Sequence, residues 1–374
     1  MKKIFICVLT AVMCAASALT VYSAESALPQ VSARSAVLIA ADSGDVVLEK
    51  DADMMLPMAS TTKIMTALVA IELLPDDRIV EIPQDAVGVE GSSVYLKAGE
   101  KLSFSDLLNS LMLASANDAA AAIAYECAGG IDEFAALMNE KARELGLEST
   151  HFTNPHGLDH EEHYTTARDL ALLTRYAMQN ERFAKVVSTL THQLERDAEN
   201  GTCFVVNHNK LLRTYDGAIG VKTGFTKRAG RCLVSAAERD GVRLIAVTLD
   251  APSDWNDHKR MLDYGFSLYE RVTVAELGRI SVNLPCIGGD KSTVKCSNAE
   301  AVSCVLKRGE KTVVQIEADR YFPAPVKKGD ALACAVIYAD GAEVARVPLL
   351  AEADVNIDDT ELSVIERILQ FLGR

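Results

Sequence analysis

Hydrophobic and polar positions along the chain predict strands first, then a block of helices, then strands again. Residues 35–40 and 46–49 are strand-like and flank a turn-rich segment at 41–45, which predicts a β-hairpin. An uninterrupted apolar run at 64–71 predicts a buried helix that opens near Ser60. Further helical patterns follow at 102–113, 117–124, 131–145 and 166–178.

Strand-like runs return after the helices and decide the predicted architecture. They lie at 218–223, 231–236 and 244–249, and a helical pattern follows at 254–269. Because these strands and the first hairpin enclose the helices, we expect an α+β domain at 27–272 whose antiparallel sheet joins distant segments. Beyond that domain, short alternating strands separated by glycine and lysine turns predict a small all-β domain at 275–352.

Both ends of the chain carry apolar segments of their own. A basic start and an apolar stretch with small residues at 4–21 predict a signal peptide at residues 1–24, cleaved after Ala18 or Ala24. The alternative is a retained membrane anchor. At the other end, apolar residues recur at helical spacing in 358–374, which predicts an amphipathic helix. This helix either rests on a membrane surface or docks on the all-β domain.

Length, charge and cysteine content narrow the class of protein. At 374 residues the chain is long enough for two domains, each with its own core. The net charge of −14 argues against nucleic acid and anionic membrane as partners of the whole surface. Of the nine cysteines, Cys7 and Cys14 lie in the predicted signal peptide, which leaves seven. An odd number without a CxxC pair indicates neither a disulfide framework nor a zinc ribbon.

A histidine-rich segment raises the alternative of a metal site. Its histidines are His151, His156, His160 and His163. A zinc protease needs two histidines four residues apart on a helix, with a glutamate after the first, and 160–164 lacks this spacing. Pro155 and Gly157 also interrupt a helix. We therefore interpret the segment as a solvated loop that holds no metal.

Ser60 and Lys63 stand where the first buried helix begins. Their spacing of three puts a hydroxyl and an amine on one helix face, which is a nucleophile–base pair if the amine is neutral. Burial and the positive end of the helix dipole both disfavour the ammonium form. Taken alone the pattern means little, because Ser-x-x-Lys is expected roughly once by chance in such a chain. It recurs at Ser292–Lys295.

The order of three short motifs distinguishes the two Ser-x-x-Lys pairs. Ser60–Lys63 is followed by Ser115–Asn117 between two predicted helices, and then by Lys222-Thr223-Gly224 at the end of a strand. Gly224 would let a substrate backbone approach the strand. The second pair, together with Ser281–Asn283, is in the wrong order and lies in the all-β domain. We interpret those residues as part of the surface.

This ordered trio resembles the SxxK, SxN and KTG motifs of penicillin-binding proteins and serine β-lactamases. The flanking residues are similar to those of the low-molecular-mass penicillin-binding proteins that are serine-type D-alanyl-D-alanine carboxypeptidases. These flanks are 59–66, 113–120, 154–158, 165–171 and 221–226. The similarity covers residues 27–269 and implies a DD-peptidase/β-lactamase-like fold. A β-rich second domain and an amphipathic C-terminal helix also fit that family.

The resemblance implies roles in catalysis for four residues. Ser60 is the expected nucleophile, which attacks the carbonyl between the two terminal D-alanines of a peptidoglycan pentapeptide. Lys63, neutral in the resting site, is the expected proton acceptor. Ser115 is expected to relay the proton to the leaving amine, while Asn117 holds the acyl chain's amide and the Lys63 side chain.

The resemblance also implies how substrate is held. Lys222 is expected to stay cationic and to pair with the terminal carboxylate, alongside the Thr223 hydroxyl. The backbone N–H groups of Ser60 and Phe225 are expected to form the oxyanion hole. The family further implies covalent inhibition by β-lactam antibiotics, no cofactor, and an exported protein at the extracytoplasmic face of a bacterial membrane or wall.

Two departures from the family pattern concern the substrate. Relatives often have histidine after Lys-Thr-Gly, whereas this chain has Phe225, and we expect changed substrate contacts rather than loss of activity. Some relatives place an arginine near the start of the helix after the second hairpin, to bind the terminal carboxylate. Residues 251–258 contain none, and the first arginine beyond them is Arg260.

Two other functions compete with this interpretation. A class A-like β-lactamase would share the trio but needs a deacylating carboxylate in a Glu-x-x-Leu-Asn stretch. The nearest match, 144–148, has glutamate in place of asparagine and lies at a predicted helix end. A non-catalytic secreted wall-binding protein would instead act through the all-β domain and would not need Ser60.

Overall fold

The computed structural model describes residues 28–196, 201 and 203–358, which fall into two compact units. The first unit ends at Leu268 and the second begins at Tyr269. The predicted signal peptide at residues 1–24 lies outside the described residues, and so does the predicted C-terminal helix beyond Asp358.

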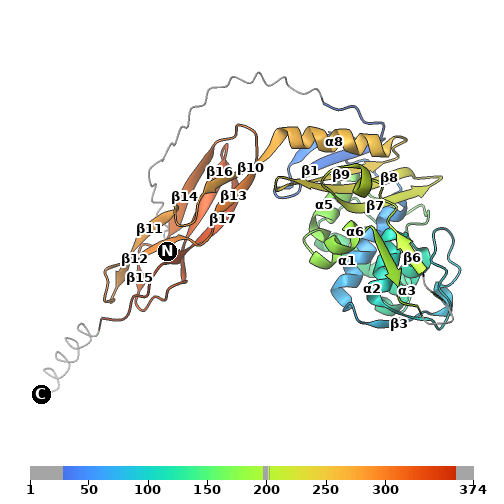
Figure 1. Ribbon diagram of the computed structural model, residues 1–374, viewed down its shortest axis with the longest axis horizontal. Coiled ribbons are helices and arrows are strands. Elements are labelled where there is room, and N and C mark those ends of the chain that lie inside the picture. Colours follow the sequence, from blue (N-terminus) through green and yellow to red (C-terminus); the bar gives the residue numbers. More distant parts are fainter. Residues whose placement is uncertain (1–27, 197–200, 202, 359–374) are drawn as a thin grey trace, which may run out of the picture. The chain divides into compact units, whose positions relative to one another are not determined.

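A five-stranded antiparallel sheet forms the centre of the first unit (Figure 1). Its strands are β1 (Ser35–Ala40), β2 (Val46–Lys50), β7 (Ala218–Thr226), β8 (Gly230–Arg239) and β9 (Val242–Leu249). Their order across the sheet is β2-β1-β9-β8-β7, and Leu38 of β1 lies opposite Ala246 of β9. The sheet therefore pairs a strand from the beginning of this unit with one from near its end, as the hydrophobic pattern predicted.

Helices cover both faces of this sheet. Figure 1 shows α8 (Asp254–Leu268) along one face and the block of earlier helices along the other. Those helices are α1 (Lys63–Leu73), α2 (Phe104–Leu113), α3 (Asn117–Ala128), α4 (Ile131–Glu144), α5 (Ala167–Ala177), α6 (Glu181–Ser188) and α7 (Leu211–Thr214). Because both faces are covered, all six residues of β1 are buried, and its sequence reads as an unbroken apolar run.

Several elements differ from the sequence prediction. The first long helix begins at Lys63 rather than Ser60, because a separate 3₁₀ turn, Ala59–Thr62, precedes it. Helices α6 and α7 and two short ribbons were not predicted. The ribbons pair β3 (Ile79–Glu81) with β4 (Lys101–Ser103), and β5 (Thr191–Leu194) with β6 (Cys203–Val206). Strands of three or four residues contain too few alternating positions to be recognised from a pattern.

Within the described residues, all the regular elements of the second unit are β-strands. They are β10 (Tyr269–Ala275), β11 (Ser281–Ile287), β12 (Thr293–Asn298), β13 (Val302–Lys307), β14 (Thr312–Ala318), β15 (Phe322–Pro323), β16 (Ala331–Ala339) and β17 (Ala342–Ala351). Six of them form one sheet in the order β14-β16-β17-β12-β11-β15, while β10 pairs with β13. The expected combination of an α+β unit and an all-β unit is thus confirmed.

The second Ser-x-x-Lys pair lies on the surface of this all-β unit. Ser292 and Lys295 are both exposed. Lys295 forms a solvent-exposed ion pair with Glu352, with 2.9 Å between Nζ and Oε1. This exposed position agrees with the interpretation of the pair as part of the surface.

None of the helices in the described parts of the chain is long and apolar enough to cross a membrane.

Candidate active site

Ser60 lies in the 3₁₀ turn at the start of α1. It is partly exposed, while the other three residues of the turn are buried. The Thr62 hydroxyl donates to the Ala59 carbonyl oxygen at 2.8 Å, and the Thr61 hydroxyl donates to that of Met58 at 2.6 Å. Ala59 has a φ of +48°, a left-handed conformation that is unfavourable for alanine. The turn therefore holds Ser60 at the surface of an otherwise buried segment.

Lys63 Nζ makes three polar contacts that define its chemistry. It lies 3.0 Å from Ser60 Oγ, 2.7 Å from Asn117 Oδ1 and 2.5 Å from the His156 carbonyl oxygen. The last two oxygens can only accept hydrogen bonds. A neutral amine has two N–H groups for them, and its lone pair is then directed at the Ser60 hydroxyl.

The surroundings of Lys63 favour that neutral form. Its side chain is fully buried at the first position of α1. Burial is the largest cause that lowers the pKa of Lys63 well below its usual value, and the nearby charge of Lys222 lowers it further. The carboxylate of Asp118 acts in the opposite direction but does not outweigh them.

Ser115 lies between α2 and α3, and Asn117 is the first residue of α3. The Asn117 side chain donates from Nδ2 to the Glu90 carbonyl oxygen at 2.5 Å. This contact requires an amide nitrogen, so it fixes the amide orientation and turns Oδ1 toward Lys63. Ser115 is buried with a φ of +61°. The structure therefore brings Ser60, Lys63 and Asn117 into direct contact.

Lys222 reaches the site from β7. Its side chain is almost completely buried, and Nζ donates to the Thr223 carbonyl oxygen at 2.9 Å. Burial lowers the pKa of Lys222 to about 7. The sequence interpretation kept this lysine cationic. In the free site the described residues offer Lys222 no hydrogen-bonded carboxylate that would offset its burial.

Gly224 brings β7 against the nucleophile turn. A Cβ atom at this position would lie 3.0 Å from Ser60 N and 3.2 Å from the Met58 carbonyl oxygen. The absence of a side chain at this position therefore lets β7 pack closely against the turn that carries Ser60. Phe225, the next residue, is 65% exposed, so its ring is free to meet a bound ligand.

The histidine-rich segment is not a solvated loop at His163, which corrects the interpretation from sequence. His163 is 3% exposed, and its Nε2 lies 2.7 Å from Thr62 Oγ1. His156 is partly buried, and its carbonyl oxygen contacts Lys63. Burial is the main cause that lowers the pKa of each histidine to about 3, so both are neutral. The segment folds back onto the nucleophile turn, a long-range contact that no local pattern signals.

The described residues contain no group of three or more His, Cys, Asp or Glu side chains able to hold a metal ion.

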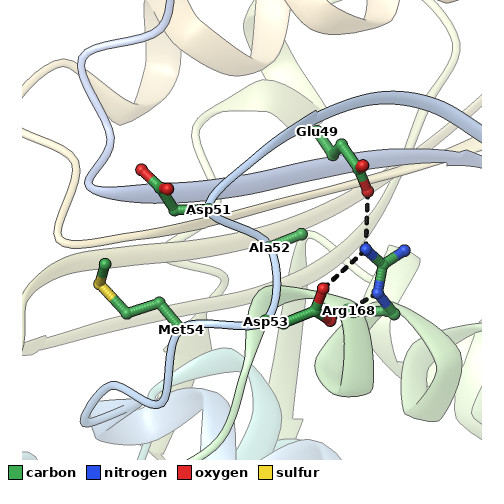
Figure 2. Close-up of a pocket in the computed structure, with 6 residues that line it drawn as sticks. All are labelled: Glu49, Asp51, Ala52, Asp53, Met54 and Arg168. Carbon is green, nitrogen blue, oxygen red and sulfur yellow. Dashed lines mark hydrogen bonds and ion pairs between the residues drawn. The ribbon is translucent and has the colours of Figure 1, made fainter.

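A surface hollow away from these motifs does not suit the expected substrate. It is lined by Glu49, Asp51, Ala52, Asp53, Met54 and Arg168 (Figure 2). The Arg168 guanidinium is ion-paired with Asp53 at 2.6 Å and with Glu49 at 2.7 Å. Three carboxylates and one arginine leave the hollow negative, so it would repel a peptide carboxylate.

Comparisons with known proteins agree with this site. Residues 21–253 match the family described as D-alanyl-D-alanine carboxypeptidase, and residues 269–356 match the penicillin-binding protein 5 C-terminal domain. D-alanyl-D-alanine carboxypeptidase DacF of Bacillus subtilis (strain 168) is 34% identical over 334 residues, 86% of this chain and 86% of the relative. D-alanyl-D-alanine carboxypeptidase DacC of Escherichia coli (strain K12) is 33% identical over 356 residues, 90% of this chain and 88% of the relative.

Solved structures show the same similarity. Penicillin-binding protein 5 from Haemophilus influenzae aligns with 88% of this chain and 99% of its own, with a TM-score of 0.68 and 28% identity. The family match covers well over half of the chain. The chain belongs to the D-alanyl-D-alanine carboxypeptidase family.

Proposed function

We propose that this chain removes the terminal D-alanine from peptidoglycan stem peptides through an acyl-enzyme at Ser60. The main support for the proposal is the set of hydrogen-bond contacts that Lys63 Nζ makes. Two acceptor-only oxygens use its N–H groups, which leaves the lone pair for the Ser60 proton. The catalytic residues belong to a domain at 27–272, and the all-β domain at 275–352 is a separate module.

Acylation begins when Lys63 accepts the proton of Ser60 and Oγ attacks the carbonyl between the terminal D-alanines. The tetrahedral intermediate places a negative charge on the former carbonyl oxygen. The backbone N–H groups of Ser60 and Phe225 stabilise it, because preorganised donors act on charge that develops in the transition state. Gly224 supports this geometry, since a Cβ atom there would lie only 3.0 Å from Ser60 N and would crowd the turn.

The leaving amine takes its proton by way of Ser115. In this scheme the proton moves from Lys63 to Ser115 and on to the amine, whose C–N bond then breaks to release D-alanine. Asn117 holds the substrate's acyl-chain amide while it keeps Lys63 in place. Water then attacks the ester carbonyl while Lys63 accepts its proton. The C–O bond to Ser60 breaks, Lys63 returns the proton to Ser60 Oγ, and the shortened peptide leaves as a carboxylic acid.

Substrate selection rests on the terminal carboxylate. Lys222 and the Thr223 hydroxyl bind this carboxylate as a charge-assisted pair. The free site holds Lys222 at a pKa of about 7, and a bound carboxylate would raise that value. Lys222 is therefore charged most fully when substrate is present.

This arrangement predicts a pH dependence for substrate capture. Lys222 is protonated below pH 7 in the free enzyme, so kcat/KM is expected to fall above about pH 7 as the cation is lost. Because a bound substrate raises the pKa of Lys222, kcat should stay constant to higher pH than kcat/KM does. KM should rise over the same range, because less of the free enzyme carries the Lys222 cation. Steady-state D-alanine release measured from pH 5 to 10 (on the order of ten points) checks this.

A C-terminal amide analogue provides the control for that profile. It lacks the carboxylate, so its lower kcat/KM should show no decline near pH 7. At acidic pH Lys63 gains a proton and can no longer act as a base. The resulting fall in kcat/KM should be the same for both substrates. An alkaline limb of equal size for both substrates would contradict the assignment of Lys222.

Labelling by a fluorescent penicillin tests the activity itself. The wild-type protein should release D-alanine from a pentapeptide, and the label should map by mass spectrometry to the peptide that contains Ser60. Release of the bound penicillin should be slow. Fast penicillin turnover without D-alanine release would instead favour the β-lactamase alternative. The structure gives that alternative little support, because Glu144 is half-exposed and ion-paired with Lys141 at 2.6 Å.

The remaining proposals concern location. We propose export through the signal peptide at residues 1–24 and action on the extracytoplasmic side of the membrane. The amphipathic pattern of residues 358–374 supports peripheral contact with a membrane surface.

A further inference from the structure

The peptide group between Ala59 and Ser60 is held from the side opposite the nucleophile. Its oxygen belongs to Ala59 and its N–H belongs to Ser60, and the two point in opposite directions because the peptide unit is planar and trans. Anything that fixes the Ala59 carbonyl therefore also aims the Ser60 N–H. The proposed function uses this N–H as an oxyanion-hole donor, and the inference below rests on that function.

A chain of hydrogen bonds ends on the Ala59 oxygen. The Thr153 backbone N–H donates to His163 Nδ1 at 3.0 Å. Nδ1 is therefore unprotonated, and the ring proton must be on Nε2. Nε2 lies 2.7 Å from Thr62 Oγ1, and Thr62 Oγ1 lies 2.8 Å from the Ala59 oxygen. The direction of every bond follows: Thr153 N–H to His163, His163 to Thr62, and Thr62 to Ala59.

Two close approaches show how little room this peptide group has. A Cβ atom on Gly157 would lie 2.0 Å from the Ala59 oxygen and 2.9 Å from Thr62 Oγ1. On the nitrogen side, a Cβ atom on Gly224 would lie 3.0 Å from Ser60 N. The histidine-rich segment and β7 thus enclose the same peptide group from its two ends. The left-handed φ of Ala59 adds a conformation that needs such support to persist.

We propose that Thr62 and His163 are positioning residues, which aim the Ser60 N–H at the developing oxyanion by holding the Ala59 carbonyl. Neither side chain touches the reacting atoms in this scheme. His163 is suited to the task because it is buried and stays neutral, with a pKa lowered to about 3 mainly by burial. The bond directions then stay the same throughout the working pH range.

The matched pair Thr62→Val and Thr62→Ser tests the proposal. Valine keeps the branched shape but lacks the hydroxyl, whereas serine keeps the hydroxyl. Loss of one oxyanion-hole donor costs about 10²–10³ in kcat, and a misaimed donor should cost about 10- to 100-fold. We expect this loss in kcat for Thr62→Val with KM changed less than about twofold, because the interaction forms only in the transition state. Thr62→Ser should recover most of the rate.

A thionoester substrate supplies a readout specific to the oxyanion hole. Sulfur is a weak hydrogen-bond acceptor, so the wild-type protein should prefer an ester substrate strongly over its thiono analogue. This ratio should fall in Thr62→Val and be restored in Thr62→Ser. A general loss of packing would lower both rates together and leave the ratio unchanged.

Thr174→Val is the control for removing a buried threonine hydroxyl. Thr174 is fully buried in α5 and donates to the Leu170 carbonyl oxygen at 2.7 Å, within its own helix. Its ester-to-thionoester ratio should equal that of the wild type. If Thr62→Val does not fold, His163→Phe and His163→Gln carry the same measurements, because glutamine keeps an N–H donor for Thr62 and phenylalanine does not.

The outcomes separate this inference from the proposed function. A folded Thr62→Val or His163→Phe protein with wild-type kcat and ratio would overturn the positioning role while leaving the carboxypeptidase activity intact. Equal losses in Thr62→Val and Thr62→Ser, with an unchanged ratio, would also overturn it. Failure of the proposed function would appear first in the wild-type protein, as absence of D-alanine release.

Discussion

Replacing Ser60 with alanine is expected to abolish both covalent labelling by penicillin and release of D-alanine. The reaction requires a nucleophilic oxygen, and alanine offers none, so the rate should fall by about 10⁴-fold or more. Folding should be unaffected, because Ser60 is partly exposed and the turn is held by Thr61 and Thr62 rather than by the serine hydroxyl. Gel fluorescence, D-alanine release and thermal unfolding measure the three quantities.

The chain contains its own control for this substitution. Ser292→Ala changes the serine of the second Ser-x-x-Lys pair, which is exposed on the all-β unit. This variant should label and release D-alanine as the wild type does. Penicillin labelling that survived Ser60→Ala at full stoichiometry would show that the nucleophile had been assigned wrongly.

Replacing Lys63 with methionine is expected to give the second largest loss. Methionine has nearly the same length and fills the buried space, but it cannot accept the Ser60 proton. General-base catalysis contributes about 10²–10⁴ in rate, so acylation by penicillin should slow by that factor. The Asn117 side-chain oxygen and the His156 carbonyl also lose their N–H partner. Their loss is partly offset because no amine remains to be desolvated.

A second substitution distinguishes a base from a mere positive charge. Lys63→Arg keeps a cation that does not give up its proton. It should be as impaired as Lys63→Met if Lys63 works as a base, whereas substantial activity in Lys63→Arg would contradict that role. Lys295→Met is the matched control. It removes only an exposed ion pair with Glu352, and it should leave acylation unchanged.

The sequence predicted the architecture of the first unit because its elements have strong local patterns. The strand β1 and the helices α2, α4 and α5 lie within a residue or two of their predicted bounds, whereas α3 extends four residues beyond its predicted end. The start of α1 was placed three residues early. The spacing of Ser60 and Lys63 suits an α-helix, but the left-handed φ of Ala59 and the 3₁₀ turn arise from contacts with distant segments.

The candidate site was predicted unevenly for the same reason. The order of three motifs identified Ser60, Lys63, Ser115, Asn117 and the Lys-Thr-Gly triplet, because sequence order eliminates chance matches that a single motif cannot. His163 was assigned to a solvated loop. Proline, glycine and charged neighbours do predict a loop there, but they carry no signal about which surface that loop packs against.

What the sequence alone determined is the set of chemical groups: a serine, two lysines and the motif order that relates them. Only the tertiary structure decided their states. Burial, with the nearby charge of Lys222, lowers the pKa of Lys63 and makes it neutral, and burial lowers the pKa of Lys222 to about 7. Protonation and backbone direction depend on desolvation and on contacts between segments about 50–100 residues apart, and these exist only once the chain has folded.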